Sequence, residues 1–271
     1  MHYVARDRIP ETIDEVLADL DVVIARARGE KSRLGYFAVL YRNVTLGVKN
    51  AIAEGRFEDG PRMERLDVAF ANRYLTALEA WRFNKPVSHC WTVAFNAATR
   101  RRPIILQHLL LGVNAHINLD LGLAAVATCT AENLASFQRD FQEVTTLLEE
   151  MIDDVQERLD RVSPWMAWLD RIGHRSDEVL CGFCIDKSRK LAWGAAEEMI
   201  VVPEDARSVR ETELDLVVAG LALPIARPAL IATIVLACIG LREESDVGRV
   251  MDTLLIAQGA TTETAPAARI T

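Results

Sequence analysis

The sequence has little cysteine and no visible secretion signal. Its 271 residues contain five cysteines, an odd number in a chain long enough to bury a core without cross-links. The N-terminal stretch lacks the apolar segment that forms the centre of a signal peptide. We therefore expect a reduced, cytoplasmic protein.

Positive charge is also in short supply, with 31 Lys and Arg against 39 Asp and Glu and a net charge of -8. Nucleic-acid binding draws its affinity from clustered cations that release counterions, so we expect no nucleic-acid partner. The short run Arg100–Arg102 is predicted to be solvated surface. With 50% hydrophobic and 26% charged residues, the composition excludes global disorder.

No uninterrupted apolar run is long enough to suggest a membrane span outside a folded core. The most membrane-like stretch, Leu214–Leu241, is broken by Pro224, Arg227 and Pro228. Neither half reaches the roughly 20 residues that a bilayer requires. We expect two buried helices that meet at a Pro-Arg-Pro corner, and no membrane span.

Strand alternation is absent, and nearly every long segment shows the 3.6-residue period of an amphipathic helix. There is no internal repeat and no break in composition. The sequence therefore predicts an all-α fold, with a single helical domain over residues 1–260 and a flexible tail over 261–271. Helices are expected at Thr12–Arg28, Gly35–Gly55, Val87–Thr99, Ile104–Thr128, Glu132–Val162, Ser176–Val201, Glu211–Leu223, Pro228–Leu241 and Asp246–Gly259, and one more is expected to begin after Gly60-Pro61 and to end at the break Asn84-Lys85-Pro86.

The segment Ile104–Thr128 is apolar on every side, which predicts a buried central helix. Each polar group inside such a helix must find a partner or lose roughly 1 to 3 kcal/mol. Six polar side chains nevertheless interrupt it: Gln107, His108, Asn114, His116, Asn118 and Asp120.

His116 and Asp120 are four residues apart, on one face of the helix. An imidazole and a carboxylate at this spacing can ligate one metal ion, or the carboxylate can orient the ring through a hydrogen bond. His108 lies eight residues earlier, about 12 Å along the axis, so we expect it beside the site. A bend at Gly112 would bring it there, as a ligand of an adjacent position or as a general base.

Asp67 lies in Arg62–Trp81, on a helical face that is otherwise apolar or aromatic. A carboxylate on such a face is paired or liganded. Asp67 could face His116 or His108 across a helix pair and supply the acidic group that a divalent ion or a general base needs.

Three interpretations of these residues are open: a structural hydrogen-bond network, a metal site, and a metal-free acid/base or ligand-binding pocket. In the second, His116, Asp120 and Asp67 hold a divalent ion such as zinc, and Asn114, Asn118 and Arg189 contact substrate. The sequence has no H-E-x-x-H motif, no E-x-x-H pair and no phosphate-binding G-x-x-x-x-G-K loop. Cys181 and Cys184 have C-x-x-C spacing but are predicted to be two core cysteines.

Three segments carry a resemblance: Phe37–Thr45, Met63–Trp81 and Leu106–Ala124, with Arg189, Ala192 and Trp193 further on. They resemble a family of bacterial helical proteins known only as a domain of unknown function. The resemblance implies an all-α fold and directs attention to Asp67, His108, His116 and Asp120. More distantly, the central helix is similar to those of zinc-dependent phospholipase C and related nucleases, although their N-terminal tryptophan ligand and several of their histidines are absent.

From these features we expect a metal-dependent enzyme, hydrolase-like, acting on a small molecule in a buried helical pocket, with His108 and Asp67 as catalytic groups. The alternative is a non-catalytic helical protein that binds an apolar small molecule or a protein partner. A homo-oligomer is possible under either. Five tryptophans could line the cavity of a carrier: Trp81, Trp91, Trp165, Trp168 and Trp193.

Overall fold

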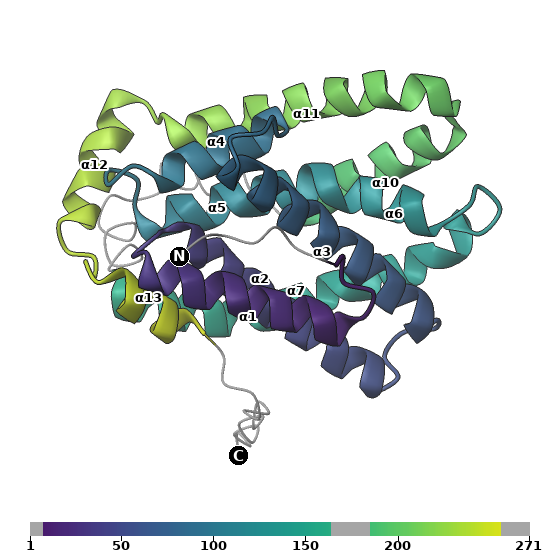
Figure 1. The fold of residues 1–271 in the computed structure, drawn as a ribbon, viewed down its shortest axis with the longest axis horizontal. Helices are drawn as coiled ribbons and strands as arrows, with labels where there is room; N and C mark the ends of the chain where they lie inside the picture. The colour runs from purple at the N-terminus through teal and green to yellow at the C-terminus, as the bar shows by residue number, and fades with distance from the viewer. Residues whose placement is uncertain (1–7, 164–184, 256–271) are drawn as a thin grey trace, which may run out of the picture.

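The fold is all-helical, as predicted. A computed structural model describes residues 8–163 and 185–255, and within these ranges it contains no strand (Figure 1). The helices are α1 (Ile13–Gly29), α2 (Leu34–Ala53), α3 (Gly60–Arg82), α4 (His89–Ala98), α5 (Ile105–Ala115), η1 (His116–Leu121), α6 (Gly122–Thr128), α7 (Leu134–Val162), α10 (Ile185–Val201), α11 (Glu204–Ala226), α12 (Leu230–Gly240) and α13 (Val247–Leu254).

The predicted central helix is present as the continuous run α5–η1–α6. Helices α2, α3, α4, α10 and α11 pack around it, and α1 covers α2 and α3 from outside (Figure 1). Among the described residues, Ile105–Thr128 is the one helical run that is long and apolar enough to cross a membrane, judged by length and composition. In the fold it is the core helix, with 78% of its most apolar window buried inside the protein.

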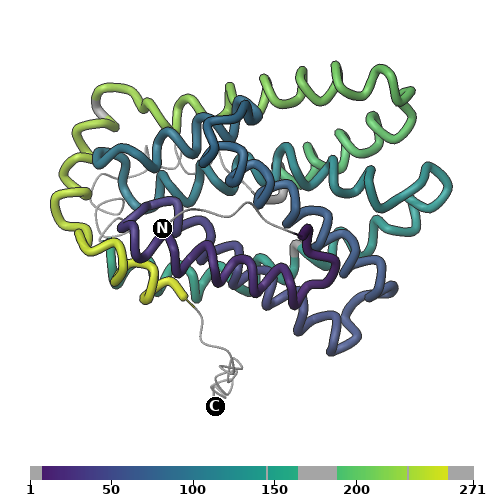
Figure 2. The backbone as a smooth tube through the Cα atoms, viewed as in Figure 1, coloured from purple at the N-terminus to yellow at the C-terminus, as the bar shows by residue number. Residues whose placement is uncertain are grey.

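Helix starts follow the local signals in the sequence. The side chain of Thr12 accepts a hydrogen bond from the backbone of Glu15 and caps α1, and Asp59 does the same for Arg62 at the start of α3. Pro61 occupies the first turn of α3, where its missing N–H would have no partner. Figure 2 shows that α1 and α2 run back along each other and that α3 crosses them.

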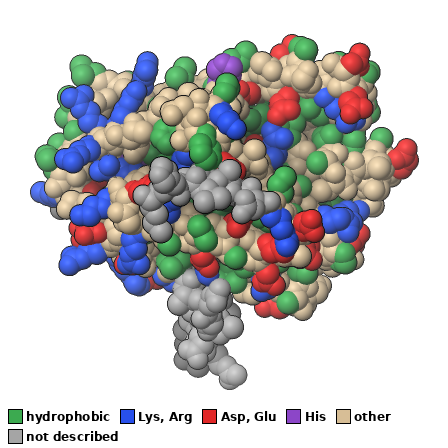
Figure 3. All heavy atoms as spheres, viewed as in Figure 1, with side chains coloured by type: hydrophobic (Ala, Val, Ile, Leu, Met, Phe, Trp, Pro, Cys, Tyr) green, Lys and Arg blue, Asp and Glu red, His purple; other side chains and the backbone are tan. Residues whose placement is uncertain are grey.

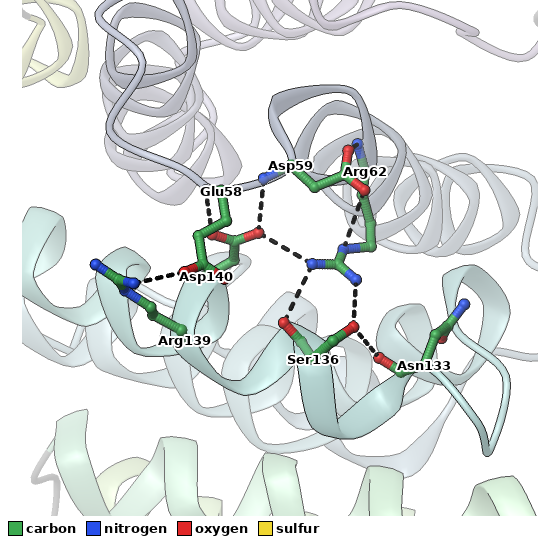
Figure 4. Close-up of polar contacts among 7 residues, drawn as sticks. All are labelled: Glu58, Asp59, Arg62, Asn133, Ser136, Arg139 and Asp140. Carbon is green, nitrogen blue, oxygen red and sulfur yellow. Dashed lines mark hydrogen bonds and ion pairs between the residues drawn. The ribbon is translucent and has the colours of Figure 1, made fainter.

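A buried ion pair fixes the α2–α3 connection to α7 (Figure 4). Asp140 accepts hydrogen bonds from the backbone N–H groups of Glu58 and Asp59, at 2.7 and 3.1 Å. Arg62 Nη2 lies 3.2 Å from Asp140 Oδ2, and its guanidinium also donates to the hydroxyl and the carbonyl of Ser136. Because every oxygen of the buried carboxylate has a partner, this pair anchors the first turns of α7.

The apolar pair of helices predicted at the Pro-Arg-Pro corner exists, but the prediction that both are buried was wrong. Helix α11 extends to Ala226, with Pro224 in its last turn, and α12 follows at Leu230. Several of their large apolar side chains face outward, including Leu216, Leu223, Leu230 and Ile234. The reason is position: α11 and α12 form the outer layer and have a core on one side only (Figure 1).

Several predicted features lie outside the described residues. These are the C-x-x-C pair Cys181 and Cys184, the tryptophans Trp165 and Trp168, and the tail over 261–271. Of the described cysteines, Cys90, Cys129 and Cys238 form no disulfide. The predicted domain limits at 1–260 stay a prediction.

Candidate functional site: an apolar cavity with a buried histidine–aspartate pair

An apolar cavity of about 300 Å³ lies between α2, α3, the central helix and α7. Its volume is at the lower end of the range of small-molecule sites. Its wall contains Asp67, His116, Tyr41 and Gln156, and its other lining side chains are apolar. They include Phe37, Leu40, Val44, Leu66, Phe70, Leu106, Leu109, Leu110, Val113, Ile117, Leu148, Met151, Ile152, Val155 and Leu159.

The cavity exists because the apolar stripe of α7 does not close onto the central helix along its whole length. An amphipathic helix packs its apolar stripe against the core, and the first residues of this stripe, Phe137 and Phe141, are buried. In its middle, Leu148, Met151 and Ile152 are only half-buried and line the cavity. These side chains therefore present apolar surface to the cavity.

His116 and Asp120 are joined directly on the central helix. His116 Nδ1 lies 3.0 Å from Asp120 Oδ2, and both side chains are almost completely buried. A carboxylate only accepts, so Nδ1 carries the proton and Nε2 is left as the acceptor. Nε2 is buried and has no hydrogen-bond partner among the described residues.

Two further donors hold Asp120, and the sequence did not reveal either of them. Arg73 Nε of α3 lies 3.0 Å from Oδ1, and Trp91 Nε1 of α4 lies 3.0 Å from Oδ2. Arg73 also pairs with Glu211 of α11 at 2.5 Å. Asp120 thus connects α3 and α4 directly to the central helix, and Arg73 extends the network to α11. Both oxygens of Asp120 accept from protein donors.

The local backbone at this pair is a π-helical turn, η1, which spans His116–Leu121. Single π turns within α-helices are often found at functional sites. The bend predicted at Gly112 was wrong, because α5 runs through that residue. Gly112 instead permits close packing: a Cβ there would lie 2.4 Å from the ring of Phe37.

The ring of His116 is enclosed by aromatic side chains. It stacks on Phe70 at a centroid distance of 3.5 Å, and Tyr41 meets it edge-on at 4.3 Å. Burial lowers the pKa of His116, an effect that Asp120 partly opposes. The imidazole is therefore neutral near pH 7.

Asp67 shares the cavity wall with His116, as the sequence predicted that it could. The carboxyl is 5% exposed, and Oδ2 has no partner among the described residues. Burial, with a smaller contribution from Glu64, raises the pKa of Asp67 to about 8. Asp67 is therefore mostly protonated at neutral pH and can donate a hydrogen bond. The pKa of Tyr41 is raised mainly by burial, and the negative charge of ionised Asp67 raises it further.

His108 does not share this cavity. It lines a separate space of about 20 Å³ together with Tyr74, Trp91 and Phe95, and its ring meets Tyr36 edge-on at 5.8 Å. Phe37 lines both spaces and stands between them. Burial lowers the pKa of His108 to about 4, with a smaller effect from Arg33.

Substitution of His108 by Leu should make the protein less sensitive to acid. The pKa of His108 is about 4 in the folded protein, below the ordinary 6.5. Between pH 6.5 and pH 4 the imidazole is therefore protonated in the unfolded chain and neutral in the folded protein. Wild-type stability should therefore fall by roughly 3 kcal/mol from pH 6.5 to pH 4 through this group. Urea unfolding at the two pH values measures the effect. An equal acid response in both proteins would contradict it.

The three predicted substrate contacts lie away from the cavity wall. Asn114 donates to the carbonyl of Val218 on α11 at 3.1 Å and accepts from Asn118 at 2.9 Å. Arg189 of α10 lies over the ring of Phe141, 5.5 Å from its centroid. The contacts of the two asparagines join helices, as in a structural network. Of the described tryptophans, Trp81, Trp91 and Trp193 also lie outside the wall.

The predicted metal ligands are therefore brought together only in part. In the ranges that the structure describes, no group of three or more His, Cys, Asp and Glu side chains is arranged to hold a metal ion. Asp120 has both oxygens engaged, so His116 and Asp67 are the two predicted ligands that line the cavity and have an atom without a hydrogen-bond partner among the described residues. The metal assignment stays a prediction.

Comparison with known proteins gives a family without an assigned activity. No curated protein and no solved structure matches the chain. One family model matches residues 13–228, a span that covers α1 to α11 and every residue of the site. The resemblance inferred from the central block is thereby confirmed, and the chain belongs to DUF5995, a family of unknown function.

Proposed function

We propose that the protein binds an apolar small molecule that carries one neutral polar group, such as an alcohol. The observation that supports this proposal is the cavity of about 300 Å³, whose wall is apolar except at a few side chains. An apolar cavity with few polar groups is typical of ligand sites, since those groups fix the orientation of a molecule held by its apolar surface.

Two of the polar side chains of the wall, His116 and Asp67, favour a hydroxyl over a carboxylate. His116 Nε2 is an acceptor, and protonated Asp67 is a donor, which matches the donor and the acceptor of an alcohol. A ligand carboxylate would add a negative charge close to Asp120 in a buried site, where the two charges would repel. His116, oriented by Asp120, could also act as a general base on the bound hydroxyl.

Dodecanol should raise the melting temperature of the protein, and dodecanoate should raise it less. At a hundred times Kd, a bound ligand stabilises by roughly 2.7 kcal/mol, which is readily seen in a thermal shift. His116→Phe keeps a ring on Phe70 but removes the acceptor, so dodecanol should bind about tenfold more weakly.

A space-filling variant provides the matched control. Val113→Trp should fill the cavity and abolish the dodecanol shift, whereas Val209→Trp, at an exposed position of α11, should leave it unchanged. Equal shifts in the two variants, or no shift with wild type, would contradict the proposal.

A metal-dependent hydrolase is the second candidate, and one observation favours it. His116 donates from Nδ1 to a carboxylate, and its Nε2 has no partner within residues 8–163 and 185–255. This is the arrangement that orients many zinc-bound histidines. In this version Asp67 and His116 are the ligands and Asp120 is the orienting group.

Elemental analysis of protein purified without a histidine tag tests this candidate. A resident ion should be present at about one per chain and be lost in both His116→Ala and Asp67→Asn. Asp14→Asn, at an exposed carboxylate, is the control that should keep it. Metal content far below one per chain in wild type would count against the hydrolase.

A further inference from the structure

Charge is distributed unevenly over this acidic chain. Residues 80–119 and 216–242 contain seven Lys and Arg and no Asp or Glu, although the whole chain has a net charge of -8. Figure 3 shows basic side chains gathered with apolar ones on the side of the molecule where α12 lies in Figure 1.

These two segments meet at the start of the central helix. Gln107 Nε2 donates to the carbonyl of Ile225 at 2.6 Å, which joins α5 to the end of α11. A Cβ at Gly240, the last residue of α12, would lie 3.4 Å from Ile104. Arg100–Arg102, directly before α5, therefore lies near the end of α12, on the same side of the molecule as the α11–α12 corner that carries Arg227.

Four of the cations at this end are exposed. Arg100, Arg101, Arg102 and Arg227 are exposed, and none forms an ion pair with a carboxylate in the part of the chain that the structure describes. Elsewhere most exposed arginines are paired, as Arg139 is with Glu58 and Arg161 with Glu157.

Large apolar side chains are exposed on the two helices of this corner. Leu230 is 77% exposed, Ile234 58% and Leu241 87%, all on α12 or directly after it, and Leu221 and Leu223 of α11 are about half exposed. A contiguous apolar patch bordered by charge marks an interaction site. Apolar side chains combined with cations are the pattern of segments that rest on anionic lipid.

We propose that the α11–α12 corner and Arg100–Arg102 form a docking surface for an anionic membrane. The leucines and Ile234 enter the headgroup boundary, and the arginines contact lipid phosphates. This surface is separate from the cavity, so the proposal does not depend on the ligand that the cavity binds.

Co-sedimentation with vesicles tests the proposal. Wild type should pellet with phosphatidylcholine vesicles that contain about 30% phosphatidylglycerol and remain in solution with phosphatidylcholine alone. Raising the salt toward about 1 M should release it, because the Debye length then shortens to about 3 Å.

Two variants separate the charged and the apolar contributions. Reversal of Arg100, Arg101 and Arg102 to Glu should weaken vesicle binding about tenfold or more, since each cation contributes near an anionic surface. The matched control, reversal of Arg65, Arg139 and Arg210 on other faces, should bind as wild type does. Leu230→Gln with Ile234→Gln should weaken binding at every salt concentration.

Three results would overturn the proposal. One is equal binding to neutral and anionic vesicles. Another is vesicle binding that the Gln pair does not weaken, which would indicate a general polyanion site. The third is an absence of vesicle binding together with a dimer, seen by sedimentation equilibrium, that the Gln pair dissociates. That result would make this face an interface between two copies of the chain.

Discussion

Asp67→Asn is expected to stabilise the protein increasingly as the pH rises. The pKa of Asp67 is about 8 in the folded protein, against an ordinary value of 3.8, because the carboxyl is buried without a charged partner. Between these values the folded protein keeps a proton that the unfolded chain has released. Wild-type stability therefore falls as the pH rises through this window, by on the order of 5 kcal/mol in full.

The Asn side chain carries no ionisable proton, so the variant should lack this decline. Chemical denaturation at about pH 5, 7 and 9 measures the difference, which should grow in favour of the variant with each step. Asp14→Asn, at a carboxylate whose side chain is 70% exposed, should leave the pH profile of wild type unchanged. Parallel profiles for wild type and Asp67→Asn would show that Asp67 is ionised in the fold.

The same experiment separates the two proposed functions. A divalent ion bound by His116 and Asp67 would stabilise the ionised carboxylate, so wild type would gain stability over the variant as the pH rises in the presence of metal. If Asp67 is instead neutral, as in the proposed alcohol site, wild type loses stability relative to the variant as the pH rises. The sign of the slope decides which site the folded protein holds.

Helical periodicity was enough to predict the fold class and the central helix. The segment Ile104–Thr128 is apolar all round because other helices surround it, and this is a local property of the sequence. The pairing of His116 with Asp120 was also local, since four residues span one turn. Asp67 could be identified as a carboxylate on an apolar face.

The contacts that complete the site depend on how distant helices pack. Arg73 is 47 residues from Asp120 and Trp91 is 29 residues from it, and no short pattern connects them. The cavity itself arises where α7 stands away from the central helix, although its apolar stripe is the same as that of a fully packed helix. His108 was expected near His116, but Phe37 stands between their cavities.

The outward faces of α11 and α12 show the same limit. An apolar segment indicates that its side chains contact other apolar surface, but it does not say whether that surface belongs to the protein's own core. The prediction that both helices are buried assumed that it does. In the fold the two helices form an outer layer, so their apolar residues and the nearby arginines become a surface. Such a distinction requires the position of a helix as well as its composition.

Asp120→Ala is expected to destabilise the protein by about 3–5 kcal/mol, the usual result of breaking a buried charged pair from one side. Asp120 is 2% exposed and accepts from Arg73, Trp91 and His116. Its removal leaves the indole N–H of Trp91 and the Nδ1–H of His116 buried without acceptors. Urea denaturation measures the loss, and Asp14→Ala, at an exposed position, should change stability by less than about 0.5 kcal/mol.

If Asp120→Ala does not fold, Asp120→Asn keeps the prediction testable. The amide has the same size, but its NH2 group must face a donor, so a loss of about 2–3 kcal/mol is expected. The nitrogen chemical shifts of the His116 ring provide a second readout. In wild type they should show a proton held on Nδ1, and in the variant a mixture of tautomers. Unchanged stability with an unchanged ring would mean that Asp120 neither holds the helices together nor orients His116.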